Sequence, residues 1–132
     1  MSSLVFPVDP AVAAATFRAR GERRFAEREE RRRAALEAVG KAVRAVLSFH
    51  PRQSRGYLFG SVVRPGAFGS ASDVDVAIES ASAEEYFAIW RELETAAPDW
   101  TVDLRVLADS PQFAEGVRSH GTIVYERLSS DS

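Results

Sequence analysis

The 132-residue chain contains no cysteine, only two histidines and no hydrophobic run of membrane-spanning length. The absence of cysteine excludes disulfide bonds and thiolate metal sites, and nothing in the composition suggests an oxidising compartment. The N-terminus has no positively charged segment ahead of its apolar residues and carries Asp9 early, which argues against a signal peptide. These absences predict a cytoplasmic protein without a membrane partner.

Length and composition indicate one domain spanning residues 1–132. Hydrophobic residues make up 45% of the chain and charged residues 27%, as in ordinary globular domains. The net charge of −2 hides a basic stretch, because residues 18–33 contain eight Arg and four Glu. Since the two signs are interleaved at helical spacings, the stretch is typical of a solvated helix surface with ion pairs, and direct nucleic-acid binding is disfavoured.

Hydrophobic periodicity and turn residues predict an α+β chain with a small mixed β-sheet. The patterns predict helices over residues 10–20, 22–48, 83–97 and 110–121, and strands over 56–59, 72–80, 100–107 and 122–128. Gly21 is expected to separate the first two helices, and the last strand is expected to lie at a sheet edge.

Helices are expected to pack mainly on one face of this sheet, which leaves the opposite face open. The second helix carries an apolar stripe formed by Leu36, Val39, Val43, Val46 and Leu47. The third helix begins with a capping box, Ser82 and Glu85, and should bury Phe87, Trp90 and Leu93.

Two aspartates in the stretch SDVDVAIES indicate a metal site. Asp73 and Asp75 project from the same face of the predicted strand, with Cα atoms about 6.5–7 Å apart, so their charges repel unless a cation lies between them. Asp103 occupies the same position in the strand WTVDLRVL and would join them if the strands are neighbours. Mg²⁺ prefers such oxygen ligands. The alternatives are separate structural roles: Asp73 as a strand-start cap, Asp75 as an edge charge and Asp103 as the partner of Arg105.

A Gly-Ser pair, Gly60 and Ser61, follows the first predicted strand and suggests phosphate binding. Glycine allows the backbone to approach a ligand closely, and a helix starting there would offer free N–H groups and a positive dipole end. Ser61 as a nucleophile is the competing interpretation. It is disfavoured because the pattern is not G-x-S-x-G and because the sequence places neither His50 nor His120 to act as its base. Both histidines are expected to be surface or turn residues.

Together, the stretches GSVVRPGAFGSASDVDVAI and TVDLRVL resemble the Gly-Ser…Asp-x-Asp signature and third-aspartate strand of the polymerase-β-type nucleotidyltransferases. The closing stretch FAEGVRSHGTIVYER is similar to the tail of minimal nucleotidyltransferases found with HEPN-domain toxins. The resemblance covers about residues 36–127. It implies a polymerase-β-like fold with a catalytic core over residues 34–128 and an N-terminal helical extension over residues 1–33.

The resemblance also implies a reaction and a set of residues. A nucleoside monophosphate, AMP from ATP, would be transferred with release of pyrophosphate. Gly60, Ser61 and Arg64 would bind the triphosphate. Asp73 and Asp75 would bind two Mg²⁺ ions, and Asp103 would complete the first metal site and accept the proton of the attacking hydroxyl. The loop after Gly60-Ser61 departs from the usual pattern of the family. Eleven residues rather than ten separate Ser61 from Asp73, and an acidic position is missing.

The acceptor suggested by the resemblance is a protein. The chain would act as an antitoxin that modifies a hydroxyl, that of a tyrosine, on a partner HEPN ribonuclease toxin, with the arginine-rich stretch as a candidate contact surface. Two alternatives remain open. One is a small-molecule nucleotidyltransferase of the antibiotic-resistance kind, and the other is a catalytically silent antitoxin that neutralises its partner by binding.

Overall fold

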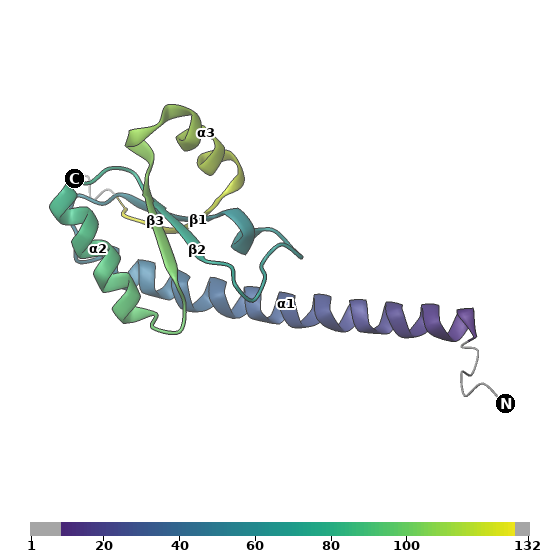
Figure 1. Cartoon of the computed structure of the whole chain (residues 1–132). Coiled ribbons are helices and arrows are strands. Elements are labelled where there is room, and N and C mark those ends of the chain that lie inside the picture. Colours follow the sequence, from purple (N-terminus) through teal and green to yellow (C-terminus); the bar gives the residue numbers. More distant parts are fainter. Residues whose placement is uncertain (1–8, 129–132) are drawn as a thin grey trace.

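The computed structural model describes residues 9–128, which form a four-stranded mixed sheet with helices on both faces (Figure 1). In chain order the elements are α1 (Pro10–Leu47), β1 (Arg55–Phe59), η1 (Gly60–Val63), β2 (Val74–Ile78), α2 (Ala83–Ala96), β3 (Val102–Val106), η2 (Leu107–Asp109), α3 (Pro111–His120) and β4 (Thr122–Glu126). The strand order is β3-β2-β1-β4. The β2–β3 pair is parallel, and β1 is antiparallel to both β2 and β4. The predicted α+β class and mixed sheet are confirmed, as is the edge position of the last strand.

Helix α1 is one continuous helix of 38 residues, so the predicted break at Gly21 is wrong. Asp9 caps its first turn by accepting a hydrogen bond from the Ala11 N–H at 2.9 Å. A single exposed glycine lowers helix stability by only about 1 kcal/mol, and the Arg and Glu residues around it are good helix formers. The N-terminal half of α1 extends away from the rest of the molecule (Figure 1).

The main hydrophobic core lies between the sheet and the helices α1 and α2. The C-terminal half of α1 contributes the predicted stripe, of which Val39, Val43 and Leu47 are fully buried. Gly56 lets α1 approach β1 closely, because a Cβ atom there would lie 2.7 Å from side-chain atoms of both Val43 and Leu47. Close contact between α1 and the sheet therefore depends on the absence of a side chain at position 56.

Helix α2 covers the edge strand β3. Trp90 and Tyr86 donate side-chain hydrogen bonds to the carbonyl oxygens of Val102 and Leu104, at 3.0 and 2.7 Å. These bonds satisfy backbone groups that an edge strand would otherwise leave unpaired. The expected burial of Phe87 is wrong: the residue is 55% exposed, and Ile89 occupies the core position instead.

The aspartate-bearing face of the sheet is not fully open, which corrects the expectation for that face. Helix α3 covers part of it with a second, smaller core that includes Tyr57, Ala77, Ala114 and Val117. The face stays uncovered by this core further along β2 and β3, where Asp75 and Asp103 lie. Helix α3 thus forms one side of the region that contains the aspartates.

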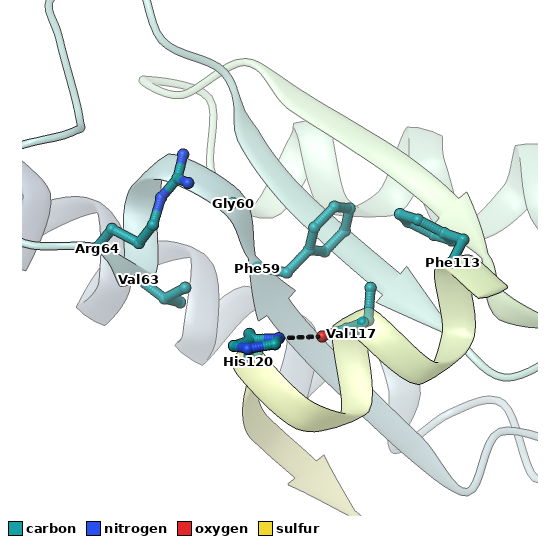
Figure 2. Close-up of a pocket in the computed structure, with 9 residues that line it drawn as sticks. Phe59, Gly60, Val63, Arg64, Phe113, Val117 and His120 are labelled. Atoms are coloured by element: carbon teal, nitrogen blue, oxygen red, sulfur yellow. Dashed lines mark hydrogen bonds between the residues drawn. The ribbon is translucent and has the colours of Figure 1, made fainter.

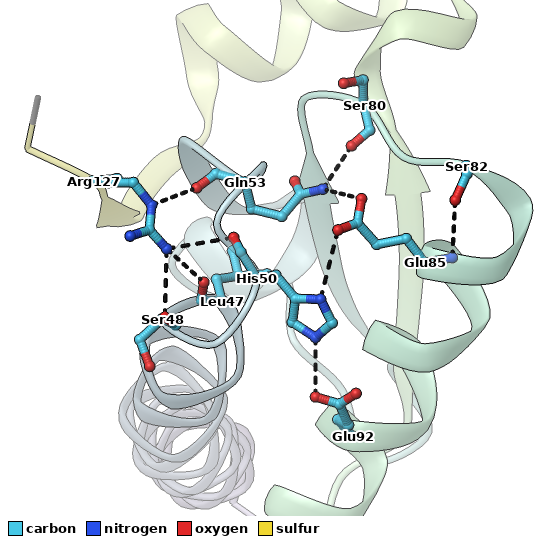
Figure 3. Close-up of polar contacts among 9 residues, drawn as sticks. All are labelled: Leu47, Ser48, His50, Gln53, Ser80, Ser82, Glu85, Glu92 and Arg127. Atoms are coloured by element: carbon cyan, nitrogen blue, oxygen red, sulfur yellow. Dashed lines mark hydrogen bonds and ion pairs between the residues drawn. The ribbon is translucent and has the colours of Figure 1, made fainter.

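Polar contacts close the C-terminal end of α1 (Figure 3). The Arg127 guanidinium donates to the carbonyl oxygens of Leu47, Ser48 and His50 at 3.3–3.4 Å, which satisfies groups that a helix end leaves free. The His50 ring contacts Glu92 at 3.1 Å in the turn after the helix. Among residues 9–128, no helix is both long and apolar enough to cross a membrane.

Candidate active site

Strand pairing brings the Gly-Ser turn and two of the predicted acids together. Asp75 of β2 pairs with Asp103 of the parallel strand β3, and on its other side it pairs with Phe59, the last residue of β1. Gly60 and Ser61 follow Phe59 directly. Because paired residues project from the same side of a sheet, the two carboxylates share one face and the Gly-Ser turn begins beside them.

Gly60 lies against the carboxylate of Asp75. Its backbone has a φ of 74°, a conformation that residues with a side chain rarely adopt. A Cβ atom at this position would also approach Asp75 Oδ2 to well under 3.0 Å, closer than real Cβ atoms come. Glycine is therefore required here both by the backbone conformation and by the position of the Asp75 carboxylate.

The electrostatic environment of Asp75 disfavours its charged form. Burial, followed by the charges of Asp103 and Asp73, raises the pKa of Asp75 above its ordinary value, and Arg105 opposes this only in part. Asp75 also lies on an interior strand of the sheet, which excludes the alternative of an edge charge. A cation bound at this position would relieve the repulsion between the carboxylates.

Asp103 and Asp73 differ from Asp75 in their surroundings. Asp103 accepts a long hydrogen bond of 3.4 Å from Arg105 Nε, so the alternative pairing with Arg105 does occur, but it is exposed to solvent and therefore weak. Asp73 is exposed and precedes β2, which begins at Val74, so its predicted position inside the strand is wrong.

These carboxylates fit the ligand preference of Mg²⁺, because they are oxygen donors that repel one another. Within residues 9–128, however, no three His, Cys, Asp or Glu side chains stand close enough together to hold a metal ion. Asp75 and Asp103 are the pair that the sheet places opposite each other, and the exposed side chain of Asp73 would have to turn toward them. Metal binding by all three acids remains a prediction.

The turn after β1 is shorter than expected. The predicted helix after Gly-Ser is a four-residue 3₁₀ turn, η1, and the backbone becomes extended at Arg64, just before Pro65. A helix dipole therefore contributes little here, and phosphate contacts would have to come from N–H groups of the turn and from the Ser61 hydroxyl. The Arg64 side chain is exposed beside this turn (Figure 2).

The loop after η1 is held by α1, a contact that the sequence pattern did not predict. The Glu29 carboxylate accepts a hydrogen bond from the Gly66 N–H at 2.7 Å and two from Arg32, at 2.8 and 3.0 Å. Arg32 also donates to the Val62 carbonyl oxygen at 3.1 Å. The hydrogen bonds from Arg32 and Gly66 lower the pKa of Glu29 to about 2. Positions 29 and 32 continue the spacing of the buried stripe toward the N-terminus, which was the available signal.

An apolar cavity of about 290 Å³ adjoins the Gly-Ser turn (Figure 2). Phe59 and Val63 line it from β1 and η1, and Phe113, Val117 and His120 line it from α3. The His120 ring is exposed and contacts the Gly116 carbonyl oxygen at 3.3 Å. The sequence does not predict this cavity, because the pattern of α3 does not reveal which face of the sheet the helix covers.

The sequence profile of the family described as Polymerase beta, Nucleotidyltransferase matches residues 41–130. Among solved structures, the chain is similar to one described as the toxin-antitoxin MntA-HepT, with a TM-score of 0.47 and 23% identity over 63% of this chain and 66% of that chain. The chain thus matches slightly less than two thirds of that solved chain, and no curated protein sequence matches it. Because the family profile covers more than half of the sequence, the protein belongs to the polymerase beta nucleotidyltransferase family.

Proposed function

We propose that this protein is a Mg²⁺-dependent nucleotidyltransferase that transfers AMP from ATP to a hydroxyl group of a partner protein. The acceptor is a tyrosine of a HEPN-domain ribonuclease toxin, and the modification silences that toxin, so the protein acts as an antitoxin. Membership of the nucleotidyltransferase family supports the reaction type. The identity of the acceptor rests on the similarity of the C-terminal stretch to minimal nucleotidyltransferases of toxin–antitoxin pairs.

One observation carries the proposed reaction: Asp75 faces Asp103 across the parallel pair, and Gly60 packs against the Asp75 carboxylate. Transfer of a nucleotidyl group requires negative charge on phosphate oxygens to be offset beside the attacking hydroxyl. Two carboxylates that repel one another favour a cation between them, and the adjacent turn brings backbone N–H groups to the same edge.

Each residue has a role in this proposal. Asp75 and Asp103 hold the metal, and Asp73 joins them once its side chain turns inward. When bound, Mg²⁺ supplies charge neutralisation and alignment of the phosphate groups. The Gly60–Ser61 turn binds the triphosphate through N–H groups and the serine hydroxyl. Asp103, on the edge strand β3, accepts the proton of the incoming hydroxyl.

The test is incubation of the protein with labelled ATP, Mg²⁺ and its partner toxin, followed by mass spectrometry of the toxin. We expect one AMP on a tyrosine, strongly reduced with Asp75→Ala and Asp103→Ala and absent when that tyrosine is replaced by phenylalanine. Asp99→Ala serves as a matched control, because Asp99 is an exposed aspartate in the turn between α2 and β3.

Two other outcomes would contradict the proposal. Label on an aminoglycoside rather than on the toxin would favour the small-molecule reaction. Full protection of cells by the Asp75→Ala and Asp103→Ala variants would show that binding alone neutralises the toxin.

A further inference from the structure

The apolar cavity between η1 and α3 has no role in the function proposed above. It shares Gly60 and Arg64 with the turn proposed to bind the triphosphate, so a ligand in the cavity would be continuous with a group bound at that turn. Its volume of about 290 Å³ lies near the lower end of the range of small-molecule sites, roughly 300–1,000 Å³. The cavity therefore has room for one planar ring system with part of an attached group.

The lining favours a flat aromatic ligand. Phe59 and Phe113 pack edge to face with ring centroids 5.3 Å apart, and Val63 and Val117 add apolar surface. Arg64 and His120 carry the polar side-chain groups of the lining. Aromatic and aliphatic walls with few polar groups bind through stacking and apolar contact rather than through a pattern of hydrogen bonds.

We propose that this cavity, which we call the α3 cavity, binds the base of the donor nucleotide, and this inference rests on the proposed nucleotidyl transfer. The position of the cavity distinguishes donor from acceptor. It lies beside β1 and the Gly-Ser turn, where the triphosphate is expected, whereas Asp103 lies on the edge strand β3, which β2 separates from β1. An acceptor hydroxyl close to Asp103 would therefore approach from the β3 edge of the sheet, leaving the α3 cavity to the nucleotide.

The lining also determines which bases the cavity selects. A purine offers a larger stacking surface than a pyrimidine, so purine nucleotides bind more tightly. Discrimination between adenine and guanine needs several fixed polar groups at the base edge, and the lining supplies only the side chains of Arg64 and His120. ATP and GTP should therefore bind with affinities that differ much less from each other than either differs from CTP or UTP.

Substitution of Gly116 tests directly whether the α3 cavity binds the base. Gly116 lies one turn from both Phe113 and His120 on α3 and lines the cavity, and a Cβ atom there would meet no atom within 4 Å. Gly116→Leu introduces a good helix former whose side chain enters the cavity. Gly116→Ala has the same backbone effect and leaves the cavity largely open, so it is the matched control.

The measurement is calorimetric titration with Mg²⁺ and two ligands: α,β-methylene-ATP, which cannot be cleaved at the reacting bond, and inorganic tripolyphosphate, which lacks a base. We expect Gly116→Leu to weaken binding of α,β-methylene-ATP by about ten- to a hundredfold, and Gly116→Ala to change it less than threefold. Tripolyphosphate should bind equally well to all three proteins. His120→Ala, an exposed position, should weaken only the nucleotide, by several-fold.

The two ligands separate failure of this inference from failure of the proposed function. If tripolyphosphate binds the wild type but Gly116→Leu and His120→Ala bind α,β-methylene-ATP normally, the base lies elsewhere and the inference is wrong. If normal nucleotide binding is accompanied by lost transfer to the partner, the α3 cavity takes the acceptor ring instead. If neither ligand binds the wild type, the proposed transfer itself fails. Equal affinity for purine and pyrimidine triphosphates would also overturn the inference.

Discussion

Substitution of Gly60 by alanine perturbs the site at the point where the backbone and a proposed metal ligand touch. Gly60 has a φ of 74°, and an added Cβ atom would meet Asp75 Oδ2 at well under 3.0 Å. The substitution changes no charge and removes no hydrogen-bonding group. Any effect must therefore come from the backbone conformation and from displacement of the Asp75 carboxylate.

The two effects have different magnitudes. The left-handed conformation costs an alanine roughly 1–2 kcal/mol of folding free energy, which corresponds to a fall in Tm of roughly 3–6 °C for each kcal/mol in a chain of this size. The contact itself costs little stability, because the closest atom is at the end of a flexible side chain and can move aside. A displacement of about 1 Å at a reacting centre can lower the rate about a hundredfold. We therefore expect a folded protein with modestly reduced Tm and about 1% of the transfer activity.

A double-mutant cycle with Asp75→Ala tests this explanation. Transfer of AMP is measured by label on the partner, and stability by thermal denaturation. Gly60→Ala should lower activity about a hundredfold in the wild type and less than twofold further in Asp75→Ala, since the displaced group is already absent. Gly66→Ala is the matched control, because Gly66 also has a positive φ, of 80°, but its added Cβ would meet the Phe25 ring. Retention of a third of the activity by Gly60→Ala, or an equal loss in Gly66→Ala, would refute the reasoning.

Further substitutions test the contacts that support the site. Because the pKa of Glu29 is lowered to about 2 from 4.5, its stabilising effect is complete above about pH 4.5 and is lost as the pH falls toward 2. Glu29→Gln should therefore have a lower Tm than the wild type at pH 7. A difference in Tm between the two proteins that does not narrow below pH 4.5 would contradict this. Gly56→Ala should destabilise the fold by about 1–3 kcal/mol in urea unfolding, because its Cβ atom overlaps Val43 and Leu47. Gly21→Ala should raise helix stability by about 1 kcal/mol, since nothing lies within 4 Å of its Cβ atom, and an unchanged or lower Tm would mean that the exposed part of α1 is not helical in solution.

Local patterns in the sequence correctly predicted most helices and strands, and they supplied the candidate acids of the site. The alternation around Asp75 correctly placed Val74, Val76 and Ile78 on the buried face, and all three are fully buried. The Ser110–Pro111 signal placed the start of α3, where Ser110 accepts a hydrogen bond from the Phe113 N–H. Such signals act within a few residues, so they can be read without knowledge of the fold.

The predictions were wrong or incomplete where contacts between residues distant in sequence determine helix placement and burial. Helix α3 could have covered either face of the sheet, and its own pattern does not indicate that it covers Tyr57 and Ala77. Phe87 fits an inward-facing helical spacing, but Ile89 and Leu93 already fill the core at that position. The sequence predicts that Asp75 and Asp103 are neighbours only if β2 and β3 pair directly. That pairing cannot be established from the sequence, and the structure shows it.

The role of α1 combines these local and distant effects. The loop over residues 62–72 contains no acidic residue of its own, and its backbone is held instead by Glu29, thirty-seven residues earlier than Gly66. Arg32 holds the same carboxylate and the end of η1, so two side chains of α1 fix the loop that connects the Gly-Ser turn to Asp73. The predicted boundary at residue 33 falls within a continuous helix and directly after this pair. The basic stretch therefore includes, among its solvated arginines, the residues that hold the loop next to the turn proposed to bind the triphosphate.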